Sequence, residues 1–226
     1  MARKILLVTA LLVTAVHCRS ENGGAVAERP GFPEPDSVDA RPVILFVGTS
    51  ITAGFGLGVE QAFPSLIQAV IDSVGFAFRV VNAGESGATS AGGVRRIGWL
   101  LQQPVRILVL ELGANDGLRG QDIGAMKSNL QLIIDETRSA HPRAKIVVAG
   151  MEAPPNMGVV YATEFRQVFT DLARENDALL IPFLLDGVAG MPELNQADGI
   201  HPTAQGHRVI AQTVWDVLGP LLAQLN

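Results

Sequence analysis

The stretch Val43-Ile44-Leu45-Phe46-Val47-Gly48-Thr49-Ser50-Ile51-Thr52 joins five consecutive apolar residues to a short polar turn. An apolar run without polar alternation is typical of a strand that is buried on both faces of a parallel sheet. Four further runs of this kind occupy residues 78–81, 107–110, 146–149 and 179–181. The sequence therefore predicts five parallel strands.

The segments between these runs have a helical pattern, because their apolar residues recur every three or four positions. Such stripes occupy residues 63–74, 126–134, 165–172 and 209–221. Regular alternation of strands and helices predicts an α/β protein. In this class a parallel sheet is covered by helices on both faces, through right-handed crossovers.

Polar residues and tight turns follow the predicted strands at short distances. Ser50 comes three residues after the first run, Gly87 six after the second, and Asn115 five after the third, while residues 151–157 extend from the fourth. In open parallel sheets, ligands bind beyond the carboxyl ends of the strands. These segments are therefore expected to meet at one edge of the sheet and to form a site.

Ser50, Asp198 and His201 have the chemistry of a nucleophile, an orienting carboxylate and a base. A serine hydroxyl attacks poorly until a base takes its proton. The turn Asp198-Gly199-Ile200-His201-Pro202 can present the imidazole to Ser50 and the carboxylate to the other ring nitrogen. Two structural alternatives remain: Ser50 can simply cap the following helix, and the Asp-Gly-Pro segment can be a surface turn.

Four segments resemble, in this order, the sequence blocks of the SGNH hydrolases, also called GDSL esterases and lipases. They are residues 48–52, 86–89, 113–116 and 198–202. Glu111-Leu112-Gly113-Ala114-Asn115-Asp116-Gly117-Leu118-Arg119-Gly120 is similar to the bacterial arylesterase, thioesterase and lysophospholipase branch. The resemblance extends from about residue 43 to residue 222. It implies a flavodoxin-like three-layer sandwich with strand order 2-1-3-4-5.

The same resemblance implies a function and a set of site residues. Ser50, Asp198 and His201 would be catalytic, and the oxyanion hole would consist of the Ser50 and Gly87 backbone N–H groups and the Asn115 amide. Gly87 and Asn115 also fit ordinary turns. The implied reaction is hydrolysis of a carboxylic ester or thioester of a small molecule or lipid, through an acyl–Ser50 intermediate and without a cofactor. Residues 151–158 are expected to shape the acyl pocket, although an ordinary turn also explains them.

Two residues depart from the family pattern. Members of the family usually have Asp where Thr49 stands, and many members of this branch have Asp where Ala88 stands. We expect the shorter Thr49 side chain to replace part of the hydrogen bonding of the loop. The alternatives are a carbohydrate O-acetyl esterase, for which an aromatic sugar platform is missing, and a non-catalytic envelope binding module.

The N-terminus predicts export. Arg3 and Lys4 precede an apolar stretch, residues 5–16, that is too short to cross a ~30 Å bilayer core but fits a signal peptide over residues 1–18. Cys18, the only cysteine, is a candidate for lipidation and a membrane tether, with cleavage near Ala15 as the alternative. Residues 19–41 then form a disordered linker and residues 42–226 the hydrolase domain. The mature protein would be periplasmic, envelope-anchored or secreted.

Composition and histidine spacing argue against other classes. The net charge of −5 does not favour a nucleic-acid partner. His201 and His207 are six residues apart, which on one helix places them on different faces, so no metal site is predicted. The glycines at positions 54, 56 and 58 are not followed by the Lys-Ser/Thr of a phosphate loop, so a nucleotide-binding site is not predicted.

Overall fold

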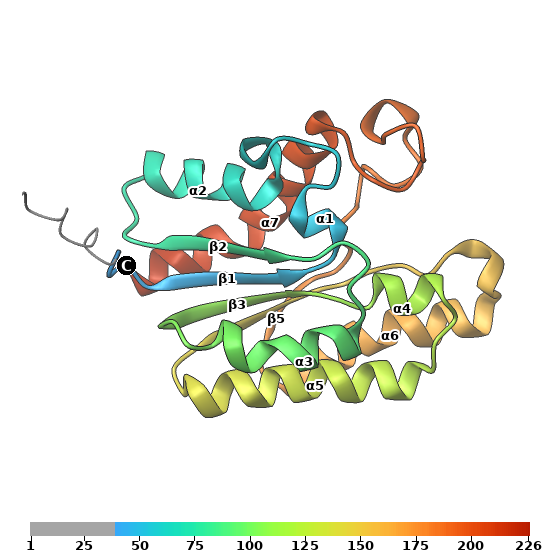
Figure 1. The fold of residues 1–226 in the computed structure, drawn as a ribbon, viewed down its shortest axis with the longest axis horizontal. Helices are drawn as coiled ribbons and strands as arrows, with labels where there is room; N and C mark the ends of the chain where they lie inside the picture. The colour runs from blue at the N-terminus through green and yellow to red at the C-terminus, as the bar shows by residue number, and fades with distance from the viewer. Residues whose placement is uncertain (1–38) are drawn as a thin grey trace, which may run out of the picture. The chain divides into compact units, whose positions relative to one another are not determined.

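Residues 39–226 are described by a computed structural model whose centre is a five-stranded parallel sheet (Figure 1). The strands lie in the order β2-β1-β3-β4-β5, and all four pairings are parallel. Their bounds are β1 Val43–Gly48, β2 Arg79–Gly84, β3 Val105–Glu111, β4 Lys145–Ala149 and β5 Leu179–Ile181. The predicted strands and the order 2-1-3-4-5 are thus confirmed.

Helices cover both faces of the sheet and complete the predicted sandwich (Figure 1). Helices α2 and α7 lie on one face, while α3, α5 and α6 lie on the other. The helices are α1 Ser50–Ala53, α2 Phe63–Ser73, α3 Ser90–Leu100, α4 Ala114–Leu118, α5 Ile123–Ala140, α6 Val159–Glu175 and α7 Ala204–Leu225. Short 3-10 turns occupy Val59–Gln61, Pro155–Met157 and Pro192–Leu194.

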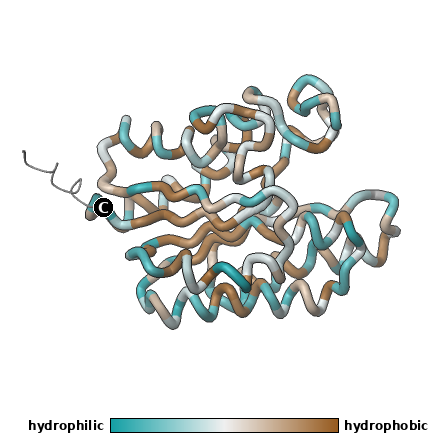
Figure 2. The backbone as a smooth tube through the Cα atoms, viewed as in Figure 1, coloured by the Kyte–Doolittle hydropathy of each residue, from teal (hydrophilic) through white to brown (hydrophobic). Residues whose placement is uncertain are grey.

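The core lies between the sheet and its two helical layers, and the strands are its most apolar part (Figure 2). Every residue of β1 is buried. Phe46 of this strand packs edge-on against Phe63 of α2, with ring centroids 5.6 Å apart. Burial on both faces explains why the strand sequences are continuously apolar.

Helix α3 was not among the predicted helical stripes. Its sequence contains Gly92, Gly93 and Gly98, which weaken both the apolar pattern and the helix propensity. A Cβ on Gly93 would lie 2.8 Å from the Ile133 side chain of α5, so glycine allows these helices to approach closely. Thr89 caps α3 by accepting a hydrogen bond from the Gly92 N–H.

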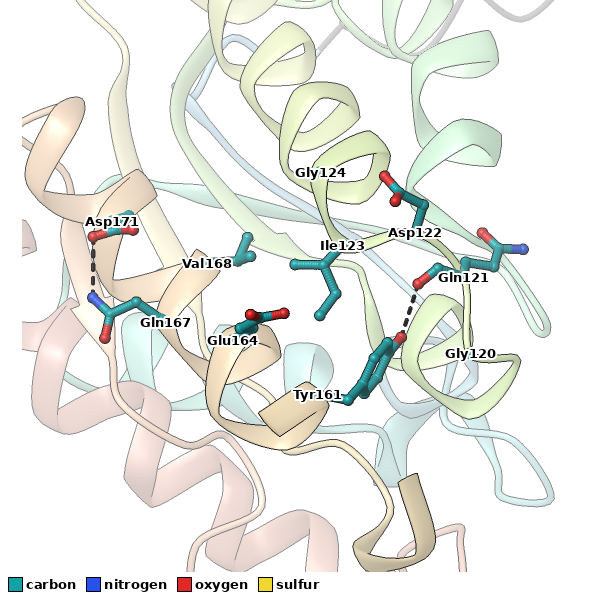
Figure 3. A pocket seen from close by; sticks show the side chains of 10 residues that line it. All are labelled: Gly120, Gln121, Asp122, Ile123, Gly124, Tyr161, Glu164, Gln167, Val168 and Asp171. Atoms are coloured by element: carbon teal, nitrogen blue, oxygen red, sulfur yellow. Dashed lines mark hydrogen bonds between the residues drawn. The ribbon is translucent and has the colours of Figure 1, made fainter. Parts of the chain in front are cut away.

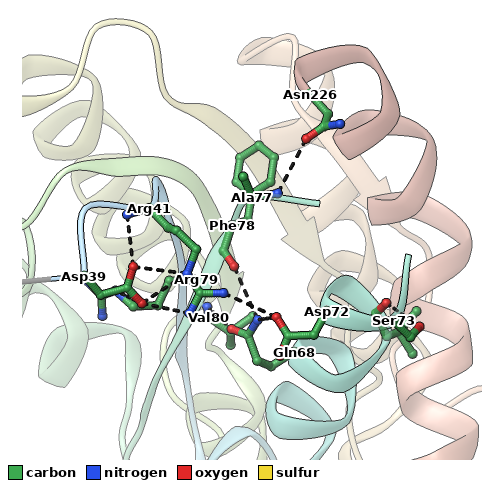
Figure 4. Close-up of polar contacts among 11 residues, drawn as sticks. Asp39, Arg41, Gln68, Asp72, Ser73, Ala77, Phe78, Arg79, Val80 and Asn226 are labelled. Atoms are coloured by element: carbon green, nitrogen blue, oxygen red, sulfur yellow. Dashed lines mark hydrogen bonds and ion pairs between the residues drawn. The ribbon is translucent and has the colours of Figure 1, made fainter. Parts of the chain in front are cut away.

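Strand β2 extends further than its apolar run because Asn82, Ala83 and Gly84 also pair with β1. At the other end of the strand, polar side chains connect β2 to its surroundings (Figure 4). Gln68 of α2 accepts a hydrogen bond from the Val80 N–H at 2.6 Å, and Asp39 forms ion pairs with Arg41 and Arg79. The first described residues therefore contact the edge of the sheet.

The predicted signal peptide, Cys18 and all but the last three residues of the predicted linker lie outside the described residues. Between residues 39 and 226, no helix is long and apolar enough to span a membrane.

Candidate functional site

Ser50 lies where β1 ends, as the first residue of α1. The chain turns sharply here because Gly48 leaves room: a Cβ on Gly48 would lie 2.5 Å from the Glu111 carboxylate. Thr49, and not Ser50, caps α1, since the Thr49 hydroxyl accepts the Ile51 N–H. The capping alternative for Ser50 is therefore not what the structure shows, and its hydroxyl is left for another partner.

That partner is His201, at the end of a continuous hydrogen-bonded chain. The Ser50 Oγ lies 3.0 Å from the His201 Nε2. The His201 Nδ1 lies 2.7 Å from the Asp198 Oδ2. The Asp198 Oδ1 accepts the backbone N–H groups of Ile200 and His201 at 2.9 and 3.0 Å. One turn thus orients both the carboxylate and the imidazole.

These hydrogen bonds determine the charge of Asp198. The backbone N–H of His201, the imidazole and the N–H of Ile200 hold the Asp198 pKa well below its usual range. The carboxylate is therefore ionised at neutral pH and accepts a proton-bearing Nδ1. In that tautomer the Nε2 lone pair faces the Ser50 hydroxyl.

Gly87 and Asn115 lie beside Ser50, in the same cavity. Gly87 has a φ of +79°, and only the Arg119 guanidinium lies within 4 Å of a Cβ built there. The backbone conformation, and not crowding, thus favours glycine. The Asn115 Nδ2 donates to the Ala88 carbonyl at 3.0 Å. This bond fixes the amide and leaves its second hydrogen available to a ligand.

A buried carboxylate that the sequence analysis assigned no role supports the Ser50 turn. Glu111, the last residue of β3, accepts the Thr49 N–H at 2.8 Å, the Thr49 hydroxyl at 3.0 Å and the Thr52 hydroxyl at 2.7 Å. Burial raises the Glu111 pKa, against the effect of these bonds. Thr49 therefore does make loop hydrogen bonds, as expected for a residue that replaces Asp. The available signal was an acidic residue directly after the apolar run of residues 107–110.

We expect Glu111→Ala to lower the free energy of unfolding by about 3 kcal/mol or more, because it leaves three buried donors without their acceptor. Glu111→Gln retains one acceptor oxygen and should cost clearly less. Urea denaturation followed by circular dichroism measures both. Glu136→Ala, at an exposed position of α5, is the matched control. Equal stability of the Glu111→Ala and Glu136→Ala proteins would contradict a supporting role for Glu111.

The cavity beside Ser50 has a volume of about 570 Å³ and is largely apolar. Ser50, Gly87, Asn115 and His201 all line it. Of the predicted acyl-pocket segment, only residues 151–154 line the cavity. Much of the wall instead comes from the segment after β5, which the sequence analysis missed: Phe183, Leu185, Ala189 and Gly190. This segment shows no helical or strand periodicity that would have identified it.

A second cavity of about 560 Å³ lies elsewhere, between the start of α5 and helix α6 (Figure 3). The Tyr161 hydroxyl bridges its two sides by donating to the Gln121 carbonyl at 3.0 Å. The carboxylates of Asp122, Glu164 and Asp171 line it, and none of the predicted site residues does. It is therefore separate from the Ser50 site.

His207 does not join the site. It is buried, and its Nδ1 accepts the Phe63 N–H at 3.1 Å. Burial lowers the His207 pKa to about 4, so the ring is a neutral structural acceptor at pH 7. Within residues 39–226, no group of three or more His, Cys, Asp or Glu side chains is arranged to hold a metal ion.

Comparison with known proteins identifies similar hydrolases. Residues 46–209 match the GDSL-like lipase/acylhydrolase family. The chain is 39% identical to esterase TesA of Pseudomonas aeruginosa over 184 residues, 81% of this chain and 90% of that protein. It is 34% identical to thioesterase 1/protease 1/lysophospholipase L1 of Escherichia coli K12, over 81% of this chain and 86% of that protein.

Solved structures of two esterases have a similar fold. A crystal structure of TesA superposes with a TM-score of 0.76, at 39% identity, over 79% of this chain and 99% of that one. The psychrotrophic esterase EstA from Pseudoalteromonas sp., inhibited by monoethylphosphonate, also gives a TM-score of 0.76, at 32% identity. That match covers 80% of this chain and 98% of EstA.

Proposed function

This chain belongs to the GDSL-like lipase/acylhydrolase family and is an esterase, and we propose that it uses Ser50, His201 and Asp198 as its catalytic triad. The observation that carries this assignment is the unbroken chain of hydrogen bonds from the Ser50 hydroxyl through His201 to Asp198, at the wall of an apolar cavity. Acyl transfer needs this combination of nucleophile, base and orienting carboxylate.

In the first half-reaction, the His201 Nε2 takes the proton of the Ser50 hydroxyl as the Oγ attacks the ester carbonyl carbon. The carbonyl π electrons move to its oxygen, which becomes the oxyanion. When the tetrahedral intermediate collapses, His201 gives its proton to the departing alcohol or thiol. Water then attacks the acyl–Ser50 ester with His201 again as the base, releasing the acid and restoring the serine.

Three donors can meet the oxyanion: the backbone N–H groups of Ser50 and Gly87 and the free hydrogen of the Asn115 amide. Two observations support this assignment. All three residues line one cavity, and the bond from Asn115 to the Ala88 carbonyl holds the amide in place before substrate binds. Donors that are fixed in advance stabilise the developing charge without reorganisation.

The apolar cavity wall favours an acyl chain as the occupant, in a carboxylic ester or thioester. The names of similar proteins, an esterase and a thioesterase/lysophospholipase, point to the same substrate classes. Neither Trp99, exposed on α3, nor Tyr161 lines the cavity, so neither of them provides a platform for a sugar there. The similarity to hydrolases also argues against the non-catalytic binding module.

Export of the enzyme is a separate proposal that rests on the sequence of residues 1–41 alone. It comprises a signal peptide over residues 1–18, a linker over 19–41, and Cys18 as a candidate lipid anchor. The hydrolase domain would then act in the periplasm, at the envelope or outside the cell.

A panel of nitrophenyl esters tests the acyl assignment. We expect kcat/KM to rise from acetyl to medium chains, by up to about fourfold per added CH2, until the cavity is filled. Ala189→Phe should shorten the preferred acyl chain, because the larger side chain fills part of the cavity. Ala140→Phe, exposed at the end of α5, is the matched control and should not. Faster cleavage of sugar acetates than of any acyl nitrophenyl ester would overturn the assignment.

A further inference from the structure

A smaller basic pocket lies next to the catalytic cavity. It has a volume of about 340 Å³ and shares Ser86 and Gly87 with the larger cavity. Three arginines line it, Arg95, Arg96 and Arg119, against one carboxylate, that of Glu85. The whole chain carries a net charge of −5, so this cluster is positive on a protein that is negative as a whole.

Arg96 has a structural role: its guanidinium donates hydrogen bonds to two backbone carbonyls, and its charge is balanced by Glu85. Its guanidinium donates to the Ala83 carbonyl at 2.6 Å and the Gly48 carbonyl at 3.0 Å. Its Nε lies 3.4 Å from the Glu85 carboxylate. The single acid of the pocket is thus matched by Arg96, and two further cations remain.

Arg95 and Arg119 have no ion-pair partner within residues 39–226. The Arg119 guanidinium donates to the Gly87 carbonyl at 3.2 Å. The Arg95 guanidinium lies over the first turn of α3, where a Cβ on Gly92 would be 3.6 Å away. Two guanidinium groups thus border one pocket next to the amino end of a helix, whose dipole adds to the positive potential.

The two sides of Ser50 therefore differ in chemistry. Ser50 follows β1. The apolar residues Met151 and Phe183 follow β4 and β5, which lie on one side of β1 in the sheet. The basic pocket lies elsewhere: it is lined by residues 85–89, which follow β2 on the other side of β1, and by arginines of α3 and of the end of α4. When an ester carbonyl is bound at Ser50, its acyl chain and its leaving group extend in different directions. An acyl chain on the apolar side directs the leaving group toward the arginines.

We propose that the basic pocket binds a phosphate group carried by the leaving group of the substrate, with Arg95 and Arg119 as its ligands. The inference rests on the proposed function, because it uses Ser50 as the point of attachment. Guanidinium groups suit phosphate oxygens through charge-assisted, bidentate hydrogen bonds. The phosphate can come from the head group of a monoacyl lipid or from a phosphorylated thiol carrier such as coenzyme A.

The test compares substrates that share an octanoyl chain and differ in phosphate. One pair is octanoyl-4′-phosphopantetheine and octanoylpantetheine, and the other is 1-octanoylglycerol 3-phosphate and 1-octanoylglycerol. We expect Arg95→Gln to lower the ratio of kcat/KM for the phosphorylated over the neutral substrate about tenfold, mainly through KM. The pair that shows the effect identifies the source of the phosphate. Arg143→Gln, at the opposite end of the sheet, is the matched control.

Arg119→Gln tests the second ligand, but it also removes the bond to the Gly87 carbonyl. It should therefore lower kcat for all substrates and, in addition, lower the phosphorylated-to-neutral ratio. An unchanged ratio in both arginine variants would overturn the phosphate subsite while leaving the esterase assignment intact. Failure of the wild-type enzyme on all four substrates and on nitrophenyl esters would instead overturn the proposed function.

Discussion

Ser50→Ala is expected to lower kcat for nitrophenyl ester hydrolysis roughly 10⁴-fold or more, the scale of loss when a triad nucleophile is removed. The variant keeps the cavity and the His201–Asp198 pair but has no oxygen to form the acyl–enzyme. Because the Ser50 hydroxyl hydrogen-bonds only to His201 among residues 39–226, the fold should be unaffected. Steady-state kinetics and a thermal melt check both points.

Ser139→Ala, at an exposed position of α5, is the matched control and should retain full activity. Activity of the Ser50→Ala protein within tenfold of the wild type would show that another group is the nucleophile.

The second large effect is expected for Asp198→Asn, again roughly 10⁴-fold in kcat. The asparagine oxygen can still accept the N–H groups of Ile200 and His201, so the turn keeps its shape. Its NH2 group then faces the His201 Nδ1 and must donate to it. The imidazole is forced into the tautomer whose Nε2 bears the proton, and it cannot act as a base toward Ser50.

This prediction separates the orienting role of Asp198 from a structural one. If the turn alone mattered, Asp198→Asn would be nearly as active as the wild type, and only Asp198→Ala would fail. Asp135→Asn, at an exposed position of α5, controls for the loss of one negative charge. Initial rates near neutral pH suffice for the comparison.

The parts of the fold that could be predicted are those in which burial leaves a direct mark on the sequence. The strand around Val43–Val47 is buried on both faces, and its sequence is therefore continuously apolar. Strand β2 was predicted too short because its pairing continues through Asn82 and Gly84, where backbone hydrogen bonds need no apolar side chain. The strand order came from the family resemblance, since periodicity does not encode which strands are neighbours.

Some residues of the site could likewise be predicted from the sequence, and others could not. Ser50, Gly87 and Asn115 could be placed together because each follows a parallel strand, and such strands end at one edge of the sheet. Glu111 could not be assigned a role, because its importance depends on Thr49 and Thr52, which are about sixty residues away in the chain. Phe183 and Ala189 were missed because the cavity wall they form is an irregular segment.

The most direct test of Ser50 as the nucleophile is the mass of the purified protein after treatment with a fluorophosphonate, followed by peptide mapping. Such reagents are attacked by an activated serine and remain attached to its oxygen. We expect one phosphonyl group per chain, on the peptide that contains Ser50, with activity lost in proportion to labelling. A folded protein that hydrolyses nitrophenyl esters yet is inactivated by labelling at a residue other than Ser50 would contradict it.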